Sequence, residues 1–433
     1  MLPLAVVFEA SLESNNTGRL LSMNAPILPR YLLGSRRAIL EVASSRWSLL
    51  VGAIFVLSAG FAREYDGEDL VHEPWHALRP LAASLATGTL LFLIVHTTAI
   101  LNKDKAQDKP PSFVRAWSVF MGLFWMTAPM AWLYAIPYER FMSPVDAVRV
   151  NLWTLGFVAA WRVILMTRVV SVLYGIGYAS SFFLVMLFAD AVVLFVMTQV
   201  STPVIDVMGG IRHSQRDALL ASVTLLVTTV SVLSAPVWII GALAAALGMK
   251  PKWSAHEPRV DDGRSHGLFL FAMISLVVFM PLLVFSQPEQ MNRREAESLL
   301  KHDRVGEAFA VMSELSPDDY PPHWNPAPKL GYRESVPSLE SVRNAMSDEW
   351  PADWVASIYL SKIDRKLRSD ISRFWGGSSW SVIFEELWEQ GVLDEIEPEH
   401  RVTAQFLLDH LPSLDEADRM ALEEIVQHAS PSD

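Results

Sequence analysis

Seven long apolar stretches occupy the first two thirds of the chain and indicate a multi-pass membrane protein. Each approaches or exceeds the ~20 residues that a helix needs to cross ~30 Å of hydrocarbon. Inside lipid every peptide group must find its hydrogen-bond partner within the protein, so we expect these stretches to be α-helices. The shortest uncharged core, 47–62, is only just long enough to span. The stretches lie near residues 47–62, 81–101, 116–136, 150–167, 178–200, 219–248 and 266–286.

Charge divides the chain into a membrane part and an acidic tail. Residues 287–433 hold 14 Lys and Arg against 29 Asp and Glu, whereas the whole chain has a net charge of −12. The tail therefore carries −15 and the rest +3. The predicted fold is all-α: a disordered extension at 1–22, a bundle of about seven transmembrane helices at 23–286, and an acidic soluble helical domain at 287–433. An acidic tail repels phosphate backbones, which excludes nucleic acid as an expected partner.

Helix signals recur along the tail. A helix is predicted from Pro351, a residue favoured in the first helical turn, to a stop at Gly376–Gly377, and another over 378–390. Ser413 and Glu416 have the spacing of a capping box and predict the start of the last helix. The stripe expected to face the core of the first of these helices consists of Val355, Ile358, Ile363, Leu367, Ile371 and Phe374.

The loops predict an orientation in the plasma (inner) membrane. Short loops rich in Lys and Arg are retained on the cytoplasmic side. The N-terminal segment and the alternate loops that follow carry 14 basic residues, and the intervening loops carry 6. We therefore expect a cytoplasmic N-terminus and, after seven crossings, an extracytoplasmic C-terminal domain.

Charged side chains inside the predicted spans are the strongest functional signal, because each is costly and normally faces protein or water. Arg162 lies in 150–167 and Asp190 in 178–200. If these two helices form a hairpin, we expect Arg162 and Asp190 to form a structural ion pair. A substrate or proton relay that also uses His96 is the functional alternative.

The sequence His72-Glu73-Pro74-Trp75-His76 matches the H-E-x-x-H pattern of zinc hydrolases. That chemistry needs both histidines on one helical face, but proline favours a helix start at Pro74, which leaves His72 outside the helix. We therefore expect no metal here, and Trp75 and His76 at headgroup level in an interfacial loop. The neighbouring carboxylates could bind a hard cation, although a solvated acidic loop is the simpler expectation. They are Glu64, Asp66, Glu68, Asp69 and Glu73.

The sequence gives little support for other kinds of catalytic site. The chain has no cysteine, which excludes a thiolate nucleophile, and no lysine lies in the predicted spans, which excludes a retinal Schiff base. The leading interpretation is a non-catalytic membrane protein without a cofactor, whose C-terminal domain docks a membrane or envelope partner. The first alternative is a solute or ion translocator that uses Asp190, Arg162 and His96. A membrane metallohydrolase at His72, Glu73 and His76 is the second.

Overall fold

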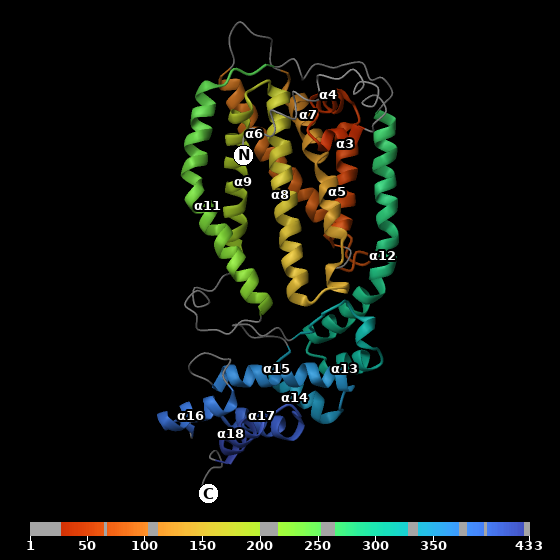
Figure 1. Cartoon of the computed structure of the whole chain (residues 1–433). Helices are drawn as coiled ribbons and strands as arrows, with labels where there is room; N and C mark the ends of the chain where they lie inside the picture. Colours follow the sequence, from red (N-terminus) through yellow and green to blue (C-terminus); the bar gives the residue numbers. More distant parts are fainter. Residues whose placement is uncertain are drawn as a thin grey trace. The chain divides into compact units, whose positions relative to one another are not determined.

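The protein is helical throughout the part that the structure describes. The computed structural model describes residues 27–64, 67–102, 111–199, 215–252, 265–327, 337–371, 379–393 and 396–427, and within these ranges every regular element is a helix (Figure 1). Six helical segments are long and apolar enough to cross a membrane, or seven if a bent pair counts as one span. The all-helical class is thus confirmed for the described residues, which contain six or seven candidate membrane-spanning helices.

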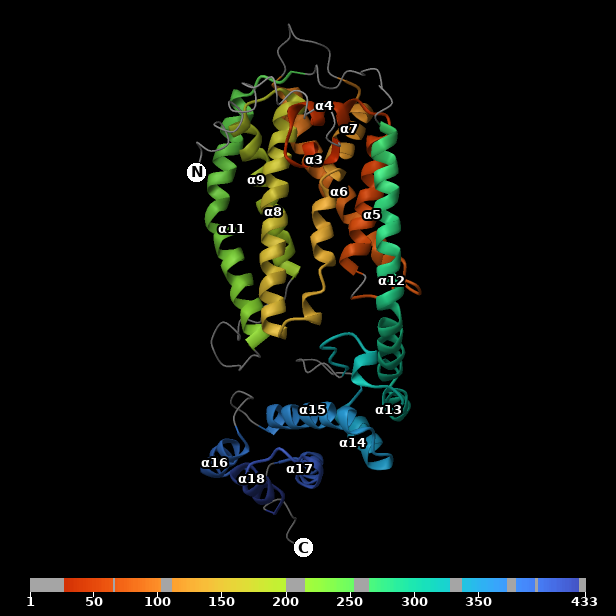
Figure 2. The same cartoon turned by 45° about the vertical axis from the view of Figure 1, so that its right-hand side comes forward.

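The long helices of the membrane region follow the predicted apolar stretches. They run side by side in both views (Figures 1 and 2). Two of them, α8 and α9, form a hairpin with a short turn between Tyr174 and Tyr178. The segments are α6 (Trp75–Leu101), α7 (Phe113–Trp125) with η1 (Ala128–Ala135) and η2 (Tyr138–Arg140), α8 (Pro144–Tyr174), α9 (Tyr178–Gln199), α11 (Gln215–Gly248) and α12 (Ser265–Lys301).

The stretch around 47–62 forms a short helix, α5 (Ser48–Glu64). Its 17 residues span ~25 Å, at the lower limit for a crossing. It meets α4 (Arg36–Ser44) at an angle of 108°, and α3 (Ile27–Leu32) precedes that pair. Close approach to α7 explains the small residues on α5, since a Cβ added at Gly52 would lie 2.7 Å from Trp125 Cβ.

The helices group into two compact units. The first unit takes in the chain up to Pro137, Val150–Gln199 and Thr224–Leu283. Its core includes Phe55, Phe92, Phe120 and Leu123, all fully buried.

The second unit contains Tyr138–Arg149, Val200–Val223 and the chain from Val284 onward. Helices α16 (Trp380–Gln390), α17 (Pro398–His410) and α18 (Glu416–Gln427) pack together, and α17 packs on α15 (Asp353–Ile371) (Figure 2). The remaining elements are the polar half of α12, α13 (Val305–Ser313), η4 (Pro317–Asp319) and α14 (Leu339–Asp348). A separate hydrophobic core runs from Ala296 to Ile425.

The tail helices lie close to their predicted positions. In the expected stripe of α15, Val355, Ile363 and Leu367 are fully buried or nearly so, whereas Phe374 and Gly376–Gly377 lie outside the described residues, as do 1–22. The predicted capping box is wrong: α18 begins at Glu416, and the carboxylate of Asp415 accepts the backbone N–H of Asp418 at 2.7 Å. An aspartate nearer the first turn replaces Ser413 as the cap.

Candidate functional site

The candidate span Phe113–Arg140 is broken near its middle. Helix α7 ends at Trp125, and after two residues the chain continues as the 3-10 helix η1, whose second residue is Pro129. Proline has no N–H to donate and clashes with the preceding turn, so it favours a break or kink in an α-helix. Irregular backbone at membrane depth must be covered by protein, and Thr127 and Ala128 are accordingly buried.

Side chains from distant parts of the chain bond to the backbone around this break. The Tyr31 hydroxyl, on α3, donates to the carbonyl of Leu123 at 2.6 Å, while Thr127 Oγ1 donates to the carbonyl of Phe124 at 2.7 Å. Trp132 Nε1, on η1, donates to Ser58 Oγ on α5 at 3.0 Å. These bonds give the broken span a fixed shape.

Arg162 reaches this break from α8. Its Nε donates to Thr127 Oγ1 at 3.2 Å, and its guanidinium lies 5.5 Å from the centre of the Phe124 ring. The hydroxyls of Tyr31 and Tyr134 are its electrostatic neighbours. Within the part of the chain that the structure describes, no carboxylate forms an ion pair with Arg162. A cation in the middle of a membrane helix therefore faces hydroxyls and an aromatic ring.

The expected ion pair between Arg162 and Asp190 does not form among the described contacts. A difference in depth does not explain why the pair is missing. Arg162 lies twelve residues before Tyr174, and Asp190 lies twelve residues after Tyr178. Each is therefore ~18 Å along its helix from the α8–α9 turn. The rotation of α8 is the reason. Its side chains, including that of Trp161, which donates to the carbonyl of Leu32 at 3.0 Å, are directed toward α3 and α7.

Asp190 lies on the face of α9 directed toward α11. Phe183 on α9 packs closely against Gly241 on α11. A Cβ added to Gly241 would lie only 2.1 Å from the Phe183 ring. Asp190 follows Phe183 by seven residues and so lies on the same stripe of α9. In this antiparallel pair it is level with Ser234, whose Oγ accepts from Trp238 Nε1 at 2.9 Å. Asp190 is 8% exposed.

His96 is held in an aromatic environment. Its ring stacks on Phe92 with centroids 4.7 Å apart, and its Nδ1 lies 3.4 Å from the hydroxyl of Tyr174. Phe113 contacts it edge-on. The three residues proposed for a relay, His96, Arg162 and Asp190, therefore have separate surroundings, and no contact joins any two of them in the described ranges.

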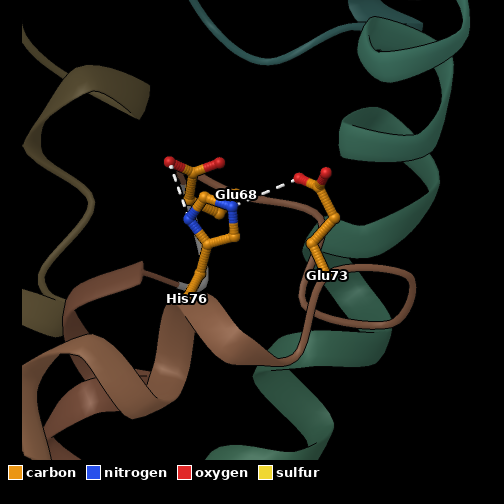
Figure 3. A group of neighbouring side chains, drawn as sticks. All are labelled: Glu68, Glu73 and His76. Carbon is orange, nitrogen blue, oxygen red and sulfur yellow. Dashed lines mark ion pairs between the residues drawn. The ribbon is translucent and has the colours of Figure 1, made fainter. Parts of the chain in front are cut away.

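The loop between α5 and α6 holds a second polar group. Pro74 is the N-cap of α6, so His72 lies outside the helix. Its Nδ1 is 2.7 Å from Oδ2 of Asp69. His76, by contrast, is only 7% exposed and lies between two carboxylates, with Nδ1 3.2 Å from Glu68 and Nε2 3.2 Å from Glu73 (Figure 3).

His76 therefore faces the protein interior. Trp75 is 52% exposed, but the next residue on a helix points ~100° away, which turns His76 inward. Oxygen or nitrogen atoms of Glu68, Glu73 and His76 all lie within 4.8 Å of one another, and His72 is not part of this group. Asp66, another member of the predicted acidic cluster, lies outside the described residues.

Several of these residues are not evident from the sequence. Thr127 and Tyr134 are ordinary members of an apolar stretch, and Tyr31 precedes the first predicted span, although Pro129 inside a predicted span signals the break. Glu68 is one acid among several in a polar loop. No protein-family model matches this chain, and neither a curated protein nor a solved structure is similar to it.

Proposed function

We propose that the membrane region binds and translocates an anionic solute, with Arg162 as the recognition residue. One observation carries this proposal: a mid-membrane arginine at a broken span has no carboxylate partner among the described residues. An isolated charge in a low-dielectric interior is costly, and such residues normally serve substrate pathways or relays. Broken helices at the bilayer midplane are a frequent feature of solute sites in transporters.

The side chains around Arg162 favour an anion as the bound solute. The guanidinium offers further N–H donors beyond the Nε bond to Thr127, and the Tyr31 and Tyr134 hydroxyls are near it. Charge-assisted hydrogen bonds to a carboxylate or phosphate are about twice as strong as neutral ones. Asp190 and His96 are outside this recognition group, which limits the translocator hypothesis to Arg162 and its neighbours.

The test is ligand-dependent stabilisation of the purified protein. Melting temperatures in mild detergent would be measured with chloride, phosphate and small mono- and dicarboxylates, followed by flux of the stabilising anion in proteoliposomes. Arg162→Gln should abolish both the stabilisation and the flux. Arg168→Gln is the matched control, because Arg168 lies on the same helix and contacts the carbonyl of Gly34. Stabilisation that persists in Arg162→Gln, or no response to any anion, would reject the proposal.

For orientation, we propose a cytoplasmic N-terminus and an extracytoplasmic C-terminus in the plasma (inner) membrane, supported by the excess of basic residues in alternate loops. The side of the C-terminus depends on whether α4 and α5 together cross the membrane. Reporter fusions after Asp433 should behave as extracytoplasmic and fusions near Lys103 as cytoplasmic. A cytoplasmic reporter signal at Asp433 would mean six crossings.

Docking of a membrane or envelope partner by the tail is the second candidate function. It is favoured by the separate core of the tail helices and by large apolar side chains on their surface, including Trp388 at 57% and Met420 at 55% exposure. A photo-crosslinking residue at Trp388 should capture one extracytoplasmic protein in cells, and the same residue at Glu307 on α13 serves as the control. Equal labelling from both positions would count against a specific surface.

A further inference from the structure

We propose that Glu68, Glu73 and His76 bind one divalent transition-metal ion, most suitably Zn²⁺, where the α5–α6 loop enters α6. This inference is independent of the anion site at Arg162. The residues come from two adjoining segments: Glu68 and Glu73 from the loop, and His76 from the first turn of the helix. Glu73 precedes the N-cap Pro74, and its carboxylate lies 3.2 Å from His76 Nε2.

The imidazole lies between the carboxylates, and its Nδ1 makes no hydrogen bond. Nδ1 is 3.2 Å from Glu68 Oε1, yet it is a buried nitrogen with no hydrogen-bond partner (Figure 3). Two ligands of one ion, each ~2.0–2.1 Å from it, are separated by ~3 Å. The distance between His76 Nδ1 and Glu68 Oε1 is close to this separation.

Burial provides an independent argument. His76 is 7% exposed, and buried polar atoms in native proteins are nearly always satisfied by protein, water or an ion. The structure therefore has a buried nitrogen without a hydrogen bond, and one ligand atom each of His76 and the two carboxylates within 4.8 Å of one another.

The loop is held in place by Asp69, the neighbour of Glu68. Asp69 is 4% exposed, and its Oδ1 accepts the backbone N–H groups of Val71 and His72, each at 3.2 Å. These bonds fix the turn that presents Glu68. The position of this ligand is therefore set before any ion binds, which lowers the cost of ordering the site.

The donor set identifies the class of ion. One imidazole nitrogen with two carboxylates suits Zn²⁺ with water completing four-coordination, whereas Ca²⁺ and Mg²⁺ prefer all-oxygen sites. Only one nitrogen of His76 can ligate the ion. The other can donate to the remaining carboxylate oxygen and fix the ring, as outer-shell partners do at many metal sites.

This site differs from the H-E-x-x-H site of zinc hydrolases. His72 is paired with Asp69 and lies outside the helix, so the second histidine of that motif is missing from the group. Glu73 becomes a ligand rather than a general base. The ion would fasten the α5–α6 loop to the first turn of α6, and the expected role is to stabilise this end of the bundle.

The experiment uses the full-length protein, purified in mild detergent, stripped with a chelator and titrated with Zn²⁺ alone. Bound zinc would be counted by mass spectrometry, and affinity measured by competition with a chromophoric chelator. We expect one ion per chain. His76→Ala and the isosteric Glu68→Gln should each weaken binding at least ~10-fold, the scale found for lost outer-shell partners. His72→Ala, the matched control, should bind as the wild type does.

X-ray absorption of the zinc-loaded wild type keeps the test independent of whether the variants fold. It should show one imidazole and otherwise oxygen ligands at ~2.0–2.1 Å. Absence of stoichiometric zinc, or affinity unchanged by His76→Ala, would overturn the proposal and leave only the contacts of His76 with the two carboxylates. Equal loss of zinc in His72→Ala, or two imidazoles in the spectrum, would overturn it in favour of the H-E-x-x-H site.

Discussion

A double-mutant cycle can test the rotation of α8, on which the anion site depends. The structure couples Arg162 to Thr127 through a 3.2 Å hydrogen bond and gives Asp190 a separate environment on α9. The substitutions are Arg162→Met, which keeps the stem without the donors, Thr127→Val, which keeps the shape, and Asp190→Asn, which removes the charge. The two double variants combine Arg162→Met with Thr127→Val and with Asp190→Asn.

The expected coupling free energies of the two pairs differ enough to show which residue Arg162 contacts. A hydrogen bond to a charged group contributes ~1.5–3 kcal/mol, so Arg162 and Thr127 should show a coupling free energy of that order. Arg162 and Asp190 do not touch, and substitutions at independent sites add to within ~0.5 kcal/mol. If the two charges formed a buried pair, breaking it would cost ~3–5 kcal/mol, and the double variant would recover much of that loss.

The assay is equilibrium denaturation of the detergent-solubilised protein, followed by tryptophan fluorescence and far-UV circular dichroism. Monodisperse elution of every variant is the control for gross misfolding. A coupling above ~2 kcal/mol between Arg162 and Asp190 would restore the ion pair expected from the sequence and refute the structural argument. A coupling below ~0.5 kcal/mol between Arg162 and Thr127 would remove the basis for the proposed site.

Three further outcomes are expected. Tyr31→Phe should destabilise the protein by ~1–3 kcal/mol in the same denaturation assay, because it leaves the buried Leu123 carbonyl without the Tyr31 hydroxyl; an unchanged midpoint would contradict this. Burial, with Glu295 and Asp319 nearby, raises the pKa of Tyr320 to about 12. The folded state then holds this proton more tightly than the unfolded chain, so stability should fall as pH rises from ~10 to ~12, and Tyr320→Phe should reduce the slope. A fragment of residues 290–433 should give a helical circular dichroism spectrum and one cooperative melt, since the core from Ala296 to Ile425 lies within it; a disordered fragment would show that it depends on the membrane helices.

The tail shows which packing can be read from sequence alone. Its helices are amphipathic, so the apolar stripe fixes both the element and the face that it buries, as Val355, Ile363 and Leu367 demonstrate. The start of a helix can also be predicted from nearby residues. Pro74 marks the start of α6 because proline is favoured at the start of a helix, and that start separates His72 from His76.

In the membrane region the sequence predicted where the long apolar helices lie along the chain. It could not determine which way a helix faces, because a helix that is apolar all round has no stripe to reveal its rotation. Only the tertiary structure directed Arg162 toward Thr127 and away from Asp190 at the same depth, and only it brought Glu68 beside His76. The physical reason is that hydrophobicity places a helix in lipid, whereas contacts between residues distant in sequence set its rotation.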